Sequence, residues 1–419
     1  MKYLPTFVMA AVFFVMGSIA EGYPLHGSDG ADIPRLEGYR KHVRVVPGAK
    51  LHLDEIELKL LEQPGFTIPE ADAEFSKALK EVLGTNAEDF SIAVLDLTDP
   101  NRVHYAEHKG GIQQNPGSLG KILIGLAIFQ ALADMYPDDQ GARMRVLNET
   151  VIEADGFIHT DSHDVPFYER ETDQLSWRPV REGDTASLFT YLDWMFGASS
   201  NAAASLCLRE AMLMVRFGRE YPVDAKRAET FFSQTPSEEL SALLRETLDG
   251  PLRRNGLNPQ NFRQGGFFTR SGKQRVPGVR SRSTSREVLN FLVRMEQGRL
   301  VDSFSSLELK RLLYMTQKRF RYSASPALDH AALFYKSGSL YSCRPEPGFT
   351  CEKNRGNVYN LLNSAAIVEA PAGDPELHYM VVVTSNVLYE DAAEVHTRLG
   401  TKIHELIQHR HGLEPTDHP

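Results

Sequence analysis

The chain has 419 residues, of which 42% are apolar and 24% are charged. This length and this mixture are typical of a folded protein with a substantial core, and they exclude a disordered or fibrous chain. The formal net charge of −9 argues against nucleic acid as the main partner. We therefore expect a globular enzyme or binding protein.

The first twenty residues have the pattern of a secretory signal peptide. Lys2 supplies a positive charge, residues 7–15 form an apolar core, and Ser18 and Ala20 are small residues where a signal peptidase cuts. An uncleaved membrane anchor is the alternative, because the apolar run nearly reaches spanning length. We expect cleavage and a periplasmic or secreted protein, in which residues 21–66 form a polar N-terminal extension.

The chain has three cysteines. Cys343 and Cys351 flank a short loop rich in proline and glycine, and disulfides persist in exported proteins, so these two residues are candidates for pairing across a hairpin. Cys207 lies among small residues typical of a buried helix and is expected to be a free thiol. The run HTDSHD at 159–164 contains metal-ligand types, but a polar loop is the favoured interpretation. We expect no metal and no cofactor.

The predicted elements fall into an order that indicates the fold. From the N-terminal side they are a helix at 68–83, strands at 90–97 and 102–106, and an apolar helix at 119–135. Later come strands at 331–336, 358–368 and 378–384, and a final amphipathic helix at 392–409. This order predicts an α+β fold with one antiparallel five-stranded sheet built from both chain ends and flanked by helices. A helical subdomain, about residues 137–315, is inserted between the two sets of strands.

The first of three motifs that suit acyl transfer is SLGK, in which Ser118 and Lys121 share one face of a helix. A serine hydroxyl needs a base to take its proton, and lysine can be that base when burial lowers its pKa. Ser118 also lies at a helix N-terminus, where backbone N–H groups favour a developing oxyanion. Alone this spacing is weak, because Ser and Lys three residues apart arise easily by chance.

The second motif is Ser199-Ser200-Asn201, between an apolar aromatic segment and a helix of small residues. The hydroxyl of Ser199 and the amide of Asn201 are two residues apart and can face one cleft from a loop. The alternative is a helix N-cap, since serine and asparagine are common first residues of helices.

The third motif is Lys336-Ser337-Gly338, at the end of an apolar strand. A lysine, a hydroxyl and a glycine on one strand can hold an anionic substrate, because glycine allows close approach of a substrate backbone. The alternative is a strand that simply ends in a turn.

In this order the three motifs resemble the S-x-x-K, S-D-N and K-T-G set of class A β-lactamases and penicillin-binding proteins. The resemblance covers roughly residues 68–411, and it includes a strand pair before the serine helix and two paired helices within 283–313. It implies the α/β/α sandwich of these enzymes, in a domain over residues 67–415. A monomer that acts on a small molecule is expected.

The resemblance also implies catalytic roles. Ser118 would attack a carbonyl carbon and form an acyl-enzyme, with Lys121 as the base for acylation. Ser199 would relay a proton towards the leaving nitrogen, aided by the charge of Lys336.

Substrate-binding roles follow from the same resemblance. Asn201 would bind an amide side chain, Ser337 a carboxylate, and Gly338 would let the substrate approach the strand. The backbone N–H groups of Ser118 and Ser339 would form the oxyanion hole.

The chain departs from the family pattern in three places. Ser200 replaces the usual Asp of the second motif, and Ser337 replaces the common Thr of the third. Class A enzymes place a catalytic glutamate in a loop that corresponds to residues 252–286, but here that segment contains no Asp or Glu and nine Arg or Lys. Glu238 and Glu239 lie upstream and are weak substitutes. The basic segment is expected to be a solvated surface, with steering of anionic substrates as the alternative.

Three functions therefore compete. The first is a serine hydrolase that opens β-lactam rings. The second is an enzyme like a D-alanyl-D-alanine carboxypeptidase, which acts on peptidoglycan peptides and releases β-lactams slowly. The third is a non-catalytic binding protein on the same fold. The missing glutamate predicts a long-lived acyl-enzyme, because no positioned carboxylate activates water.

Overall fold

The computed structural model describes residues 46–414 except 160, 170–173 and 317–318. The predicted signal peptide at 1–20 and part of the predicted extension lie outside the described residues. The described part of the extension, residues 46–66, packs against the domain. Ile56 and Leu60 are buried in its core, and the backbone N–H of Leu51 donates to the hydroxyl of Tyr314.

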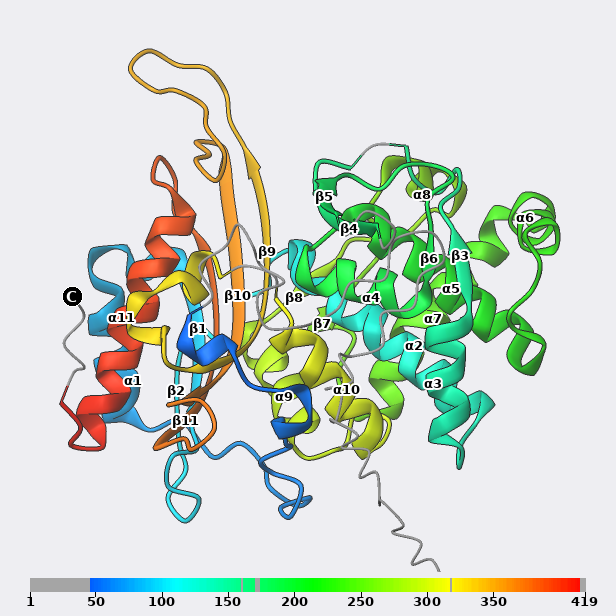
Figure 1. The fold of residues 1–419 in the computed structure, drawn as a ribbon. Coiled ribbons are helices and arrows are strands. Elements are labelled where there is room, and N and C mark those ends of the chain that lie inside the picture. The colour runs from blue at the N-terminus through cyan, green and yellow to red at the C-terminus, as the bar shows by residue number, and fades with distance from the viewer. Residues whose placement is uncertain (1–45, 160, 170–173, 317–318, 415–419) are drawn as a thin grey trace, which may run out of the picture.

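One antiparallel five-stranded sheet forms the centre of the fold (Figure 1). Its order is β2-β1-β11-β10-β9, so strands from the two chain ends pair in the middle. The strands are β1 (Phe90–Asp96), β2 (His104–His108), β9 (Ala332–Ser342), β10 (Tyr359–Ala370) and β11 (Leu377–Asn386). This confirms the predicted α+β fold. Strand β9 continues beyond its predicted end at Lys336, because backbone pairing with β10 extends through the Ser-Gly-Ser stretch.

Helices cover both faces of the sheet. On one face α1 (Ala73–Leu83) and α11 (Ala392–Arg410) bury apolar side chains against it, whereas α9 (Ser285–Glu296) and α10 (Ser303–Tyr314) lie on the other face (Figure 1). Helix α1 begins later than predicted, because Asp72 caps it by accepting a hydrogen bond from the Phe75 N–H at 3.0 Å.

Helices α9 and α10 pack on the sheet, so the helical region that lies away from the sheet is shorter than the predicted 137–315. It contains α3 (Gln140–Glu149), α4 (Leu188–Gly197), α5 (Asn201–Phe217), α6 (Ala225–Gln234), α7 (Ser237–Arg254) and α8 (Arg270–Arg275). Three small two-stranded sheets were not predicted, because strands this short carry little periodicity. They are β3 (Val151–Glu153) with β6 (Thr185–Ser187), β4 (Val165–Glu169) with β5 (Gln174–Arg178), and β7 (Phe262–Arg263) with β8 (Arg282–Ser283).

Helix α2 (Lys121–Met135) is a core helix that packs against the inserted helices α5 and α7 and against α10. A 3₁₀ turn, Gly117–Gly120, precedes it, so Ser118 lies in that turn rather than in the α-helix. The stretch Gly117–Met135 is long and apolar enough to cross a membrane, but most of it is buried inside the protein. Its hydrophobicity is therefore explained by core packing.

The strands β9 and β10 extend into a long hairpin that projects from the body (Figure 1). Cys343 and Cys351 form a disulfide in its loop, as their positions suggested, and Cys207 is a buried free thiol in α5.

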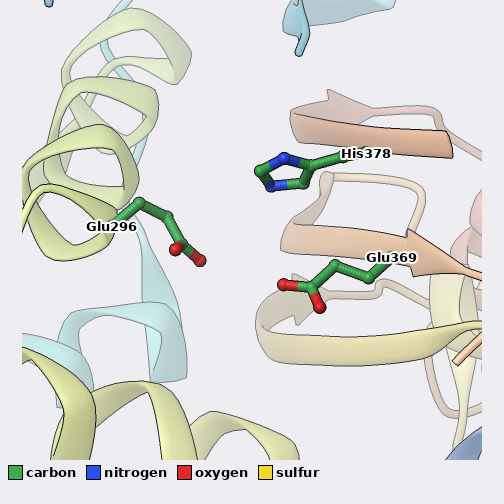
Figure 2. A group of neighbouring side chains, drawn as sticks. All are labelled: Glu296, Glu369 and His378. Carbon is green, nitrogen blue, oxygen red and sulfur yellow. The ribbon is translucent and has the colours of Figure 1, made fainter. Parts of the chain in front are cut away.

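A buried ionic cluster joins α9, α10 and the sheet. Lys310 Nζ lies 2.6 Å from a carboxylate oxygen of Glu296 and 2.7 Å from one of Glu369. Figure 2 shows these two glutamates beside His378, a combination whose chemistry suits a metal ion. The Lys310 ammonium lies between the carboxylates, so it is their counter-ion. Burial and the nearby Lys310 and Lys59 lower the pKa of His378 to about 3, so this imidazole is neutral.

Candidate active site

The four predicted catalytic side chains lie together in one hydrogen-bonded group. Ser118 lies in the 3₁₀ turn Gly117–Gly120, Lys121 is the first residue of α2, Ser199 lies in the loop between α4 and α5, and Lys336 lies on β9. Lys121 Nζ is 3.1 Å from Ser118 Oγ and 3.4 Å from Ser199 Oγ, and Lys336 Nζ donates to Ser199 Oγ at 2.7 Å. Segments that are 78 and 137 residues apart in sequence therefore meet at one point.

Lys121 has the environment of a lysine that can act as a base. Its side chain is buried, and burial lowers its pKa to about 7, against the opposing effect of the Asp161 charge. The amine donates to the carbonyl oxygen of Ser199 at 2.5 Å and to Oδ1 of Asn201 at 2.8 Å. These two acceptors take both hydrogens of a neutral amine, which leaves its lone pair for the hydroxyl of Ser118.

Lys336 is the second buried lysine of the group. Burial lowers its pKa well below the usual value, and the charges of Lys121 and Arg321 lower it further. Ser199 adopts φ = 58°, an uncommon conformation for a residue with a side chain. In this conformation its carbonyl oxygen reaches Lys121 while its hydroxyl lies between the two lysines.

Gly338 allows β9 to touch the turn that carries Ser118. A Cβ on Gly338 would lie 2.1 Å from Pro116 O and 2.5 Å from Ser118 N, so no other residue fits without displacing that turn. Gly117, at φ = 54°, would place a Cβ 3.0 Å from Ser339 N. The backbone N–H groups of Ser118 and Ser339, predicted as the oxyanion hole, thus both lie where β9 touches the turn that carries Ser118.

Arg321 is a site residue that the sequence analysis missed. Its guanidinium donates to Ser337 Oγ and to Ser339 Oγ, both at 2.8 Å. Two hydroxyls and a guanidinium beside Lys336 provide donors for an anionic group such as a carboxylate. Nothing in the local sequence around Arg321 signals this role, because the contact depends on the fold placing a 3₁₀ turn (Arg321–Ala324) against β9.

The second motif combines the two interpretations that its sequence allowed. Ser200 is the N-cap of α5, with its Oγ accepting from the Ala203 N–H at 3.1 Å, while Ser199 and Asn201 on either side contact Lys121. The cap holds the backbone between the two residues that face the site.

The segment that lacks a glutamate, 252–286, places an aromatic ring beside Lys121. Lys121 Nζ lies 4.7 Å from the ring centroid of Phe268, so an apolar ring of this segment contacts the amine. Glu238 and Glu239, the weak substitutes, are exposed in the first turn of α7.

Five of the nine basic residues in this segment pair with carboxylates from elsewhere in the chain. The pairs are Arg253–Glu246, Arg254–Asp134, Arg263–Asp249, Arg275–Glu229 and Arg286–Glu107. Much of the positive charge is therefore neutralised locally, which favours the surface interpretation over steering of anionic substrates.

Solved structures show the same arrangement of elements. A variant of PBP-A, solved as its acyl-enzyme complex with penicillin G, matches with a TM-score of 0.50 at 12% sequence identity, over 82% of this chain and 100% of that one. The chain has the fold of the penicillin-binding protein PBP-A. A β-lactamase from Sphaerobacter thermophilus matches with a TM-score of 0.49 at 13% identity, over 80% of this chain and 97% of that one. No protein-family model matches the sequence, and a search of curated proteins found no match.

Proposed function

We propose that this protein is a serine hydrolase that forms an acyl-enzyme on Ser118 with β-lactam-type amides and releases the acyl group slowly. The observation that carries the proposal is the buried amine of Lys121, 3.1 Å from the hydroxyl of Ser118 and within hydrogen-bond distance of two other acceptors, Ser199 O and Asn201 Oδ1. A binding protein without catalysis has no need of such an activated pair.

The acylation step follows from the positions of these groups. Neutral Lys121 takes the proton of Ser118 Oγ while this oxygen bonds to the carbonyl carbon of the amide. The N–H groups of Ser118 and Ser339 stabilise the negative oxygen that forms. Ser199, hydrogen-bonded to Lys336, donates its proton to the leaving nitrogen and receives in its place the proton that Lys121 took from Ser118, so Lys121 returns to its neutral form. The C–N bond breaks and an ester on Ser118 remains.

A carboxylate on the substrate is favoured by the group formed by Arg321, Ser337 and Ser339. Both β-lactams and peptides that end in a free carboxylate meet this requirement, so a peptidoglycan peptidase of the carboxypeptidase type belongs to the same proposal. Rapid β-lactam hydrolysis is the second candidate. It is less favoured because Phe268, rather than a carboxylate, contacts Lys121 from the 252–286 segment.

Mass spectrometry after incubation with penicillin G tests this proposal. We expect one acyl group per chain, attached to Ser118, that persists for many minutes, and no adduct on Ser118→Ala. A chromogenic β-lactam should give a single stoichiometric burst. Rapid steady turnover would favour the second candidate, and an unlabelled wild-type protein would overturn acyl transfer altogether.

We also propose that the protein is exported, with cleavage after the predicted signal peptide. The disulfide between Cys343 and Cys351 supports an oxidising compartment. Expression of the full chain in a Gram-negative host should give a periplasmic product whose intact mass lacks about the first twenty residues. A product that keeps Met1 in the membrane fraction would instead identify an uncleaved anchor.

A further inference from the structure

The buried carboxylate of Asp161, from a distant loop, is hydrogen-bonded to the second motif. Asp161 Oδ2 accepts a hydrogen bond from Ser200 Oγ at 2.6 Å and another from the Ala202 N–H at 2.9 Å. Its other oxygen, Oδ1, is 2.6 Å from Nδ1 of His163. The Asp161 side chain has no exposed surface, and both oxygens have partners. The acidic and histidine run that suggested only a polar loop thus contributes a residue to the site.

Asp161 is held in its charged form. Burial alone would raise its pKa, but the hydrogen bond and charge of His163, with the N–H of Ala202, bring the pKa below the usual value. The carboxylate lies at the N-terminus of α5, where the helix dipole stabilises a negative charge. Its charge also acts on Lys121 and opposes the lowering of that pKa by burial.

The loop that carries Asp161 is fixed to the loop that covers Lys121. The carbonyl oxygen of Phe157 accepts hydrogen bonds from Thr269 Oγ1 at 2.6 Å and Ser271 Oγ at 2.8 Å, both in the residues that directly follow Phe268. Asp161 is therefore placed by a packed structure and not by a free surface loop.

We propose that Asp161 is a positioning residue of the acyl-transfer site, which supplies from a separate loop the carboxylate that Ser200 replaces in the second motif. The inference rests on the proposed function. Ser200 lies between the two residues that accept hydrogens from Lys121, Ser199 and Asn201. By fixing Ser200 and the Ala202 N–H, Asp161 fixes both acceptors, and with them the direction of the Lys121 lone pair.

Three variants separate the two contributions of Asp161. Asp161→Ala removes the hydrogen bonds and the charge, and it should lower the acylation rate constant between about ten- and a hundred-fold, because small misplacements of catalytic groups have effects of this size. Asp161→Asn keeps the shape and one acceptor oxygen but loses the charge. Ser200→Asp in the Asp161→Ala background returns a carboxylate to the motif, and it should recover most of the lost rate. Asp164→Asn, at an exposed position of the same loop, is the matched control.

The pH profile of acylation is the readout that a merely structural residue would not change. The charged groups that bear on Lys121 and its lysine partner are Asp161, Lys336 and Arg321. Loss of the negative charge in Asp161→Asn should lower the pKa of Lys121, so the acid limb of the profile should move to lower pH, while Asp164→Asn leaves it in place.

Each outcome has a distinct meaning. If wild-type protein is acylated, and Asp161→Ala and Asp161→Asn match it in rate and pH profile, the inference fails while the proposed function stands. A double variant no faster than Asp161→Ala would show that the two carboxylate positions are not equivalent, which also overturns it. If the wild-type protein is not acylated, the proposed function itself fails. Thermal unfolding of every variant identifies any loss of rate that comes from loss of folded protein.

Discussion

Replacement of Lys121 with methionine is expected to lower the rate constant for acylation of Ser118 by a factor of about 10²–10⁴, the usual contribution of a general base. Methionine fills a similar volume but has no basic nitrogen. The folded protein should remain, because an apolar side chain replaces a buried amine. Stopped-flow measurement with a chromogenic β-lactam gives the rate, and thermal unfolding gives the stability.

The exposed residue Lys80 offers a matched control, since Lys80→Met removes the same group from the surface of α1. The wild-type pH profile supplies an independent check. The base must be neutral, and the pKa of Lys121 is about 7, so the acylation rate should rise about tenfold per pH unit below 7 and level off above it. An acid limb near the ordinary lysine pKa, or an unaffected Lys121→Met protein, would contradict the assignment of the base.

Replacement of Lys310 with methionine is expected to reduce the free energy of unfolding by about 3–5 kcal/mol, the typical result of removing one partner of a buried ion pair. The change leaves the carboxylates of Glu296 and Glu369 together in the core without their counter-ion. It also removes the hydrogen bond from Lys310 to the carbonyl oxygen of Glu57, which ties the N-terminal segment to α10. Denaturant unfolding at neutral pH measures the loss.

The control is Lys77→Met, at a position where the side chain is 80% exposed and where we expect almost no change. Burial raises the pKa of Glu296 above its unfolded value, and loss of the Lys310 charge raises it further, so the destabilisation is full at neutral pH and diminishes as the pH falls and this carboxyl group takes up a proton. A loss at pH 7 no larger than that of Lys77→Met, or one that grows towards low pH, would show that the cluster has another charge state.

The structure also explains why the second motif was difficult to interpret. Ser200 has the chemistry of an N-cap, and the structure places it at the N-cap of α5. The local sequence therefore indicated its role as a cap correctly, but it did not indicate its second hydrogen-bond partner. Its second partner, Asp161, lies 39 residues earlier in the chain, in a run with no periodicity that indicates burial. Hydrogen bonds between distant loops leave no recognisable pattern in the sequence of either loop. Each loop has the ordinary polar composition of a loop whether or not it has such a partner.

The sequence by itself determined the succession of strands and helices along the chain, the serine helix and three short motifs, because alternation, helical spacing and turn residues are local properties of the chain. The tertiary structure alone decided what surrounds these motifs. It brought Arg321 to the hydroxyls of Ser337 and Ser339, Phe268 to Lys121, and Asp161 to Ser200. These contacts depend on burial and on the distance between atoms, and burial is also what lowers the pKa of Lys121. A lysine three residues after a serine is common, whereas one that is buried and has its hydrogens engaged elsewhere exists only in the folded chain.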